Sequence, residues 1–316
     1  MQHSMEEIKS RLLGYLESET FLPKMVVIYG PTASGKSGFA IEIAKFLREN
    51  GSSPEIISAD SRQIYRGLDI GTGKIQKDEM EGIPHHMLDI IDVSEKYSMI
   101  DFRRDVDTLP VWGKSNIVPI LCGGTGLYID SVLYDMDFPE NPPDWEYRKE
   151  LEVIRSEKGN EFLWNMLFAV DPEYARELAP SNYRYIMRGL EVMRDTGKSK
   201  KESHNTKKLR FDPFFITPYT DSIENRKALY ETIDRRVATM FSSGLLEEVI
   251  YNISKFGAHC PGLETIGYKE VVAYLEGKTS LETAITLVQQ HSRNYAKRQI
   301  TWNKRYAHSG STIAYK

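Results

Sequence analysis

The sequence predicts an α/β fold in which a doubly wound parallel sheet is interrupted by an all-helical insertion domain. Short apolar, β-branched segments alternate with helical patterns, which is typical of such a sheet. Between Pro139 and Arg210, about seventy residues have helical periodicity and no convincing strand. Buried parallel strands are expected at residues 25–29, 55–59, 117–122 and 214–217.

The change from alternating strands and helices to helices alone also predicts the domain organisation. Residues 1–138 and 211–316 should form the core, and residues 139–210 a separate helical domain. In the core, helices are expected from Ser37 to about Leu47 and from Leu281 to about Tyr306. In the insertion, Asp171 should cap a helix that has Pro172 in its first turn.

Composition places the chain among ordinary globular proteins. Of its 316 residues, 41% are hydrophobic and 27% are charged. It contains no apolar run of membrane-spanning length, and its first residues lack the apolar stretch of a signal peptide, so a cytoplasmic location without a membrane partner is expected. Two cysteines, Cys122 and Cys260, are too few for a disulfide framework or a zinc site. A monomer is expected.

A phosphate-binding loop lies between the first predicted strand and the first predicted core helix. Residues 30–37 read GPTASGKS, which matches the pattern G-x-x-x-x-G-K-[ST] in the structural context that the motif requires. In such a loop backbone N–H groups surround phosphate oxygens, Lys36 adds positive charge, and the Ser37 hydroxyl can hold Mg²⁺. The core should therefore be P-loop NTPase-like. The expected phosphate-binding residues are Gly30, Pro31, Thr32, Ala33, Ser34, Gly35, Lys36 and Ser37.

The loop alone leaves the ligand open, because ATPases, GTPases, small-molecule kinases and some transferases share it. Ligands of open α/β sheets bind beyond the carboxyl ends of the strands, so Asp60 and the GGTG run at 123–126 should face the same crevice as Lys36. The strand before GGTG ends without the carboxylate that common NTPases use to hold Mg²⁺. This favours Asp60 as a proton acceptor for a nucleophile, with a helix or turn cap as the alternative.

Residues 60–74, DSRQIYRGLDIGTGK, resemble the bacterial tRNA dimethylallyltransferases and do not resemble the corresponding segment of nucleotide kinases or GTPases. Further runs fit the same family in the same order, and the resemblance extends over most of the chain from Val26 to Trp302. These runs are GPTASGKS (30–37), GIPHHMLDI (82–90), YSMIDFRRD (97–105), GGTGLYI (123–129), RGLEV (188–192), IGYKE (266–270) and YAKRQITW (295–302).

The resemblance implies a chemistry and two substrates. In this family the loop holds the diphosphate of dimethylallyl diphosphate, and the acceptor is the exocyclic N6 of an unmodified adenosine 37 in tRNA. By similarity Arg236 would join the loop in binding diphosphate, with Mg²⁺ on Ser37. Asp60 would take the proton from the adenine amino group. Thr125 would lie beside Asp60 and hydrogen-bond the reacting groups, although it could equally be a local turn device.

Basic residues gather near the carboxyl end although the net charge of the chain is −4. Five of them and no acid lie between Leu287 and Tyr306, which favours a surface that follows an RNA backbone; a solvated helix is the alternative. The resemblance assigns the insertion to the anticodon stem-loop, while Tyr185 and Gly189 depart from its usual arginine and alanine. The expected tRNA contacts are Asp60, Ser61, Arg62, Gln63, Thr125, Arg148, Arg184, Tyr185, Arg188, Lys269, Arg293, Lys297 and Arg298.

Three rival functions remain at this point. An adenylate isopentenyltransferase acting on free AMP, ADP or ATP would share the chemistry, but it would not require the insertion or the basic helix. A small-molecule P-loop kinase should have a carboxylate after the strand that ends in GGTG. A non-enzymatic RNA-binding module would have no use for Lys36, Ser37 and Asp60.

Overall fold

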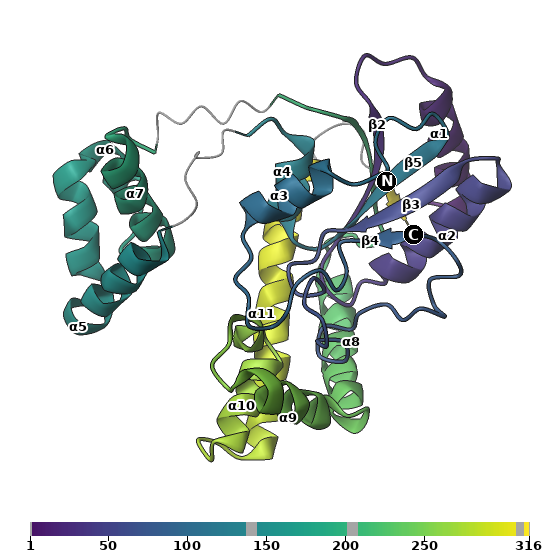
Figure 1. Cartoon of the computed structure of the whole chain (residues 1–316). Coiled ribbons are helices and arrows are strands. Elements are labelled where there is room, and N and C mark those ends of the chain that lie inside the picture. Colours follow the sequence, from purple (N-terminus) through teal and green to yellow (C-terminus); the bar gives the residue numbers. More distant parts are fainter. Residues whose placement is uncertain (1, 137–143, 201–207, 308–312, 316) are drawn as a thin grey trace. The chain divides into compact units, whose positions relative to one another are not determined.

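The computed structural model describes residues 2–136, 144–200, 208–307 and 313–315 (Figure 1). The chain forms two compact units, the first made of Met1–Tyr134 with Leu209–Lys316 and the second of Asp135–Lys208. An antiparallel bridge between Tyr134 and Leu209 joins the points where the chain leaves and re-enters the first unit. The expected boundary at residue 139 lies outside the described residues, and the return to the first unit comes at 209 instead of 211.

The described strands of the first unit form one parallel sheet in the order β1-β7-β6-β2-β5-β3-β4. The four strands predicted from apolar runs are β2, β3, β5 and β6, each within two residues of its expected bounds. The other three contain only two or three residues each, too few for a recognisable pattern. The bounds are β1 Gln2–His3, β2 Lys24–Tyr29, β3 Ser53–Ser58, β4 His85–His86, β5 Ile117–Gly123, β6 Asp212–Thr217 and β7 Ile313–Tyr315.

Helices cover both faces of the sheet, which confirms the doubly wound α/β class (Figure 1). Helices α1 (Met5–Glu17) and α2 (Lys36–Glu49) pack on one face. Helices α3 (Met99–Asp107) and α4 (Gly126–Leu133) pack on the other face, together with Tyr306 near the end of α11 (Leu281–Ala307). Because both faces are covered, β2 is buried along almost its whole length, and it therefore appears in the sequence as a continuous apolar run.

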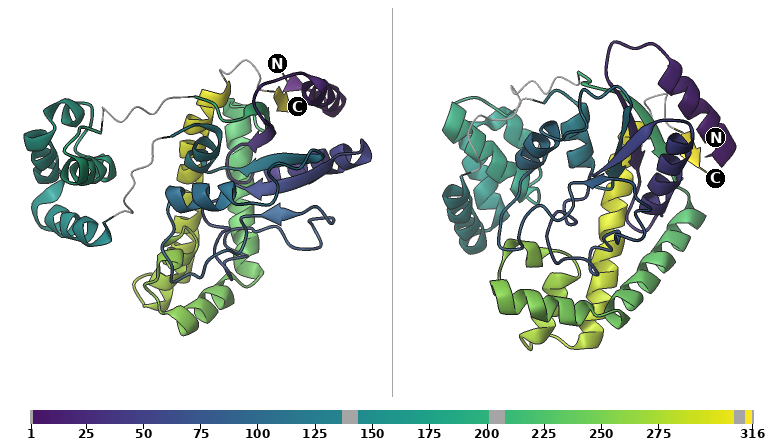
Figure 2. Two further views of the ribbon diagram at one scale, coloured as in Figure 1. Left: turned by 45° about the horizontal axis from the view of Figure 1, so that its top comes forward. Right: turned by 45° about the vertical axis from the view of Figure 1, so that its right-hand side comes forward.

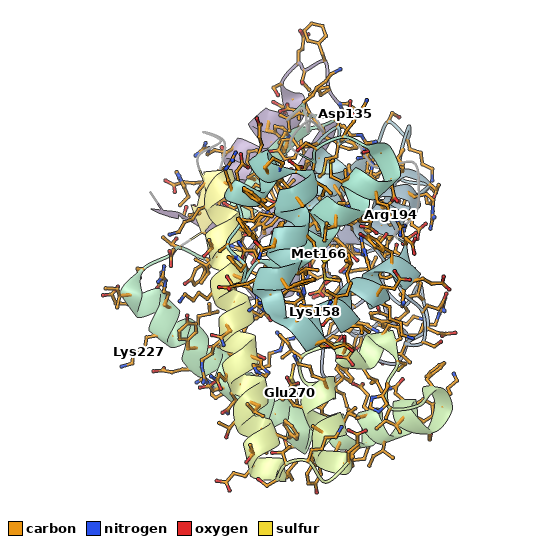
Figure 3. The ribbon with its side chains drawn as sticks, turned by 90° about the vertical axis from the view of Figure 1, so that its left-hand side faces the viewer. Asp135, Lys158, Met166, Arg194, Lys227 and Glu270 are labelled. Atoms are coloured by element: carbon orange, nitrogen blue, oxygen red, sulfur yellow. The ribbon has the colours of Figure 1, made fainter. Side chains whose placement is uncertain are left out.

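The remaining helices of the first unit extend beyond the carboxyl ends of the central strands. Helix α8 (Ile223–Ser242) lies beside α11, as both views in Figure 2 show. After α8 come α9 (Leu245–Phe256), the short 3₁₀ helix Pro261–Glu264 and α10 (Tyr268–Leu275). Glu270 of α10 lies against α11, where its carboxylate is 2.6 Å from Nδ1 of His291 (Figure 3).

The second unit is helical, with α5 (Trp145–Val170), α6 (Pro172–Arg176) and α7 (Tyr183–Thr196). Helix α5 is interrupted at Gly159, which has φ of 84°. The unit has a core of its own, which includes Leu163, Leu167 and Ile186. The predicted cap is confirmed: Asp171 accepts a hydrogen bond from the N–H of Tyr174 at 3.1 Å, and Pro172 opens α6.

None of the helices in the described parts of the chain combines the length and apolar character that a membrane crossing requires.

We expect Gly123→Ala to destabilise the sheet where the functional strands end. A Cβ at position 123 would lie 2.2 Å from the backbone carbonyl oxygen of Ala59, which cannot move without distorting β3. Overpacking of this kind lowers the free energy of unfolding by about 1–3 kcal/mol or more. The matched control is Gly14→Ala, because a Cβ in the middle of α1 meets no atom within 4 Å and should raise stability by about 0.5–1 kcal/mol. Chemical denaturation followed by circular dichroism measures both changes, and wild-type stability of Gly123→Ala would contradict the expectation.

Candidate active site

The phosphate-binding loop wraps tightly at the end of β2. Ala33 and Gly35 have φ of 62° and 80°, so the chain turns through left-handed conformations before α2 begins at Lys36. The ammonium group of Lys36 donates to the carbonyl of Pro31 at 2.6 Å, which folds this side chain back over the loop. The hydroxyl of Ser34 is buried and has no hydrogen-bond partner among the described residues. Loop N–H groups, a helix N-terminus and an unpaired hydroxyl together suit a bound anion.

A buried amide on α11 connects the loop to the turn after β5. Oε1 of Gln299 accepts from the N–H of Thr32 at 2.7 Å, and its Nε2 donates to the carbonyl of Gly124 at 2.9 Å. A Cβ on Gly124 would come within 2.2 Å of Gln299 Nε2, so the second glycine of GGTG is needed for this approach. Sequence reasoning missed Gln299. The available signal was its place in the YAKRQITW run, which contributes to the family resemblance and to the basic stretch but assigns no role to Gln299.

Asp60 and Thr125 follow neighbouring strands, and the turns that contain them contact each other, as topology predicted for Asp60 and the GGTG run. Asp60 follows β3, and its Oδ1 accepts from the N–H of Arg62 at 2.9 Å. Thr125 follows β5 and donates its N–H to the carbonyl of Ala59 at 3.1 Å, while its hydroxyl accepts from the N–H of Ser61 at 3.2 Å. Both side chains therefore stabilise local turns. Asp60 also lines the cavity at these strand ends, so the turn-cap alternative and its chemical role are compatible.

A cavity of about 1040 Å³ opens beside these strand ends in the first unit. Its wall includes Lys36 and Ser37 of the loop, Asp60 and Gln63 from the segment after β3, and Arg236 of α8. The predicted phosphate-binding loop, acid and distant arginine thus share one cavity. The strands on either side of β2 end in Gly123 and Thr217, so neither supplies a carboxylate as its last residue.

Lys36 and Arg236 are half-buried cations in this cavity, and Asp60 is the carboxylate that acts on the pKa of both. Burial lowers the pKa of Lys36 to about 8, and the nearby Asp60 partly offsets that effect. Burial likewise lowers the pKa of Arg236, and Asp60 again acts in the opposite direction. Arg236 donates from Nη2 to the carbonyl of Thr72 at 3.1 Å, and it lies so close to Gly73 that a Cβ there would be 1.7 Å from Nη2. A desolvated cation is stabilised by an anionic ligand, so the arrangement suits a diphosphate.

The predicted RNA contacts after β3 have different surroundings. Arg62 is exposed and Ser61 is half-buried at the turn. Gln63 is half-buried in the cavity wall, where its amide donates to the carbonyl of Gly73 and accepts from the hydroxyl of Ser58, both at 3.3 Å. Arg62 is therefore the most accessible of these three residues.

The basic residues of α11 also differ in their surroundings. Arg293 forms an ion pair with Asp234 of α8. Lys297 and Arg298 are exposed, and neither forms an ion pair with another described residue. Lys269 is exposed on α10.

The last two cations of α11 lie near acids of the first unit. Lys304 is 3.8 Å from a carboxylate oxygen of Asp221, and Arg305 is 3.8 Å from one of Asp130. Of these exposed cations, Lys297 and Arg298 are the two without an acidic partner among the described residues.

In the second unit two of the predicted tRNA contacts, Arg148 and Arg188, bind the same buried acid. Glu191 is fully buried on α7, and its carboxylate binds Arg148 of α5 at 2.7 Å and Arg188 at 2.5 Å. Although burial acts to raise it, hydrogen bonds from both arginines hold the pKa of the Glu191 carboxyl below its ordinary value. Arg184 and Tyr185 are exposed on the same helix. The i, i+4 spacing of Arg184 and Arg188 did not reveal this pairing with Arg148.

Comparisons with known proteins show the family of the chain. Residues 63–306 match the family described as IPP transferase, and residues 23–100 match the isopentenyl transferase family. A tRNA dimethylallyltransferase of Caldanaerobacter subterraneus is 43% identical over 293 residues, covering 90% of this chain and 89% of that protein. The corresponding protein of Bacillus subtilis is 40% identical, with coverage of 88% and 87%.

Solved structures that resemble the chain belong to the same family. The tRNA isopentenylpyrophosphate transferase of Bacillus halodurans has a TM-score of 0.64 at 37% identity, covering 92% of this chain and 89% of that one. A eukaryotic dimethylallyltransferase acting on tRNA has a TM-score of 0.72 at 30% identity, covering 89% of this chain and 70% of that one. The chain belongs to the tRNA dimethylallyltransferase family.

Proposed function

We propose that this protein transfers a dimethylallyl group from dimethylallyl diphosphate to N6 of adenosine 37 in tRNA and releases diphosphate. One observation carries the chemistry: Lys36, Arg236 and Asp60 line one cavity beyond the carboxyl ends of the strands, and Asp60 is the acid that acts on the pKa of both cations. Membership of the tRNA dimethylallyltransferase family favours tRNA over a free adenine nucleotide, and prenyl transfer over a kinase reaction.

The leaving group is bound by the phosphate-binding loop. As the bond between the allylic carbon and oxygen breaks, the electron pair goes to the diphosphate, whose negative charge grows. Donors that already face this position strengthen with that charge and lower the barrier. The loop N–H groups, the Ser34 hydroxyl, Lys36 and Arg236 are suited to this task because they are held by the fold before the ligand arrives.

Magnesium fits the loop only as an ion shared with the substrate. The described residues contain no cluster of three or more acidic, histidine or cysteine side chains that could hold a metal. Ser37 lines the cavity, and Mg²⁺ commonly combines one or two protein oxygens with phosphate oxygens. Ser37 would hold the ion, which would supply further positive charge to the diphosphate.

The acceptor nitrogen needs a base because its lone pair is delocalised into the adenine ring. In our proposal Asp60 receives the proton from N6 as the nitrogen–carbon bond forms, and Thr125 hydrogen-bonds the reacting groups from the adjoining turn. A base stacked within an anticodon loop cannot reach the edge of a sheet, so adenosine 37 must be extruded into the site. Arg62 is exposed and Ser61 is half-buried beside it, and both can contact the adjacent nucleotides.

Asp60→Asn is the most direct test of the proposed base. The amide oxygen can still accept the hydrogen bond from Arg62 that closes the turn, but it cannot take a proton. We expect kcat to fall by about 10²–10⁴-fold, with the affinity for tRNA unchanged. Single-turnover transfer of labelled dimethylallyl groups measures the first quantity, and filter binding the second. The control is Asp78→Asn at an exposed position, and wild-type kcat in Asp60→Asn would remove Asp60 from the mechanism.

Diphosphate affinity should depend on the charge of Lys36. Its pKa of about 8 means that the free protein carries this charge below pH 8 and loses it as pH rises through that value. The affinity for inorganic pyrophosphate, measured by calorimetry, should therefore fall with rising pH relative to Lys36→Arg, which remains charged. Ionisation of the ligand cancels in this comparison because both proteins meet the same ligand. Parallel pH profiles for the two proteins would contradict the assignment.

Binding of tRNA should depend on salt through the exposed cations of α11. We expect the double variant Lys297→Gln with Arg298→Gln to reduce the slope of log affinity against log salt concentration by roughly 1–2. The control is Lys114→Gln, an exposed lysine just before β5 at the opposite end of the strands. An unchanged slope in the double variant would show that these side chains do not contact phosphates.

A further inference from the structure

The carboxylate of Glu248 accepts hydrogen bonds from backbone N–H groups of the loop that follows Leu68. Oε2 accepts hydrogen bonds from the N–H groups of Asp69 and Ile70 at 3.0 and 2.9 Å. Oε1 accepts from the N–H of Gly71 at 3.2 Å and from the hydroxyl of Tyr268 at 2.5 Å. Four donors on one carboxylate fix its position and the path of three consecutive residues.

The fixed loop has little space to move. A Cβ on Gly71 would lie 2.5 Å from the ring of Tyr268, which is fully buried. The loop then passes Arg236, where the carbonyl of Thr72 accepts from Nη2 at 3.1 Å and the backbone of Gly73 lies directly against the guanidinium. The chain path held by Glu248 therefore sets the position of an acceptor that orients Arg236.

Several carboxylates line this cavity besides Asp60, and Glu248 is one of them. Glu248 lines the same cavity as Lys36 and Arg236, and its charge acts against a bound diphosphate. If Glu248 acted only through this charge, its removal would strengthen diphosphate binding. If it acts by holding the loop, its removal would weaken binding, so the sign of the change separates the two roles.

We propose that Glu248 is a positioning residue for the diphosphate, acting through the loop at residues 69–73 on Arg236. This inference rests on the proposed function, in which Arg236 binds the leaving group. Glu248 touches neither reacting atom in this proposal. Its contribution is to hold a backbone acceptor that keeps the guanidinium directed into the cavity.

Glu248→Gln tests the role with almost no change in volume. The amide can accept from only part of the donor set, because its NH₂ group must face an N–H or the hydroxyl of Tyr268. We expect the affinity for inorganic pyrophosphate to fall roughly tenfold, with a matching rise in KM for dimethylallyl diphosphate and little change in kcat. The matched control is Glu247→Gln, the same change at the exposed neighbouring position of α9, which should leave all three quantities unchanged.

A double-mutant cycle with Arg236→Gln shows whether the effect passes through the guanidinium. Coupled residues give non-additive changes, so Glu248→Gln should cost no further pyrophosphate affinity once Arg236 is replaced. Tyr268→Phe removes one donor and should weaken binding in the same direction by a smaller factor. If Glu248→Gln fails to fold, Tyr268→Phe tests the proposal in its place.

The outcomes separate this inference from the proposed function. Unchanged or tighter pyrophosphate binding in Glu248→Gln, or full additivity with Arg236→Gln, would overturn the positioning role and leave the function intact. Wild-type pyrophosphate affinity in Arg236→Gln would instead overturn the assignment of Arg236 to the diphosphate, and the inference about Glu248 with it.

Discussion

The two hydrogen bonds of the Gln299 amide hold the active site together. The phosphate-binding loop follows β2 and the GGTG turn follows β5, and parallel pairing brings these strand ends to one edge without fixing the turns relative to each other. Gln299 accepts from one turn and donates to the other, a combination that an amide can make and a carboxylate cannot. The glycines of the second turn are required because Gly123 and Gly124 have no room for a side chain.

The residues at this edge of the sheet also determine the charge of the cavity. The protein has a net charge of −4, yet its cavity is lined by Lys36 and Arg236, half-buried cations whose pKa values are lowered by desolvation. Keeping such groups charged costs free energy in the empty protein, and a diphosphate relieves that cost when it binds. The acid needed for proton transfer, Asp60, comes from β3, one strand further from the phosphate-binding loop than β5.

Local patterns predicted those parts of the molecule that depend on local physics. The strands β2, β3, β5 and β6 are recognisable because burial on both faces requires continuous apolar runs, and the loop at residues 30–37 because its conformation requires glycine at set positions. Topology then brought Asp60 and Lys36 to one cavity. Gln299 and Glu248 were missed because their roles arise from contacts with residues far away in sequence. An amide or a carboxylate on an amphipathic helix has no local signature of such a partner.

The contacts of the arginines in the helical unit could not be predicted from the sequence either, and these contacts affect how the arginines can bind RNA. The sequence paired Arg184 with Arg188 by helical spacing, whereas the fold pairs Arg188 with Arg148 through the buried Glu191. A guanidinium has five N–H donors, so binding to Glu191 leaves each arginine with donors for a second acceptor. Both side chains are already ordered, which lowers the entropy lost when a phosphate or base edge binds. Such arginines favour geometrical selection of a ligand, while exposed Lys297 and Arg298 are suited to charge attraction that salt screens.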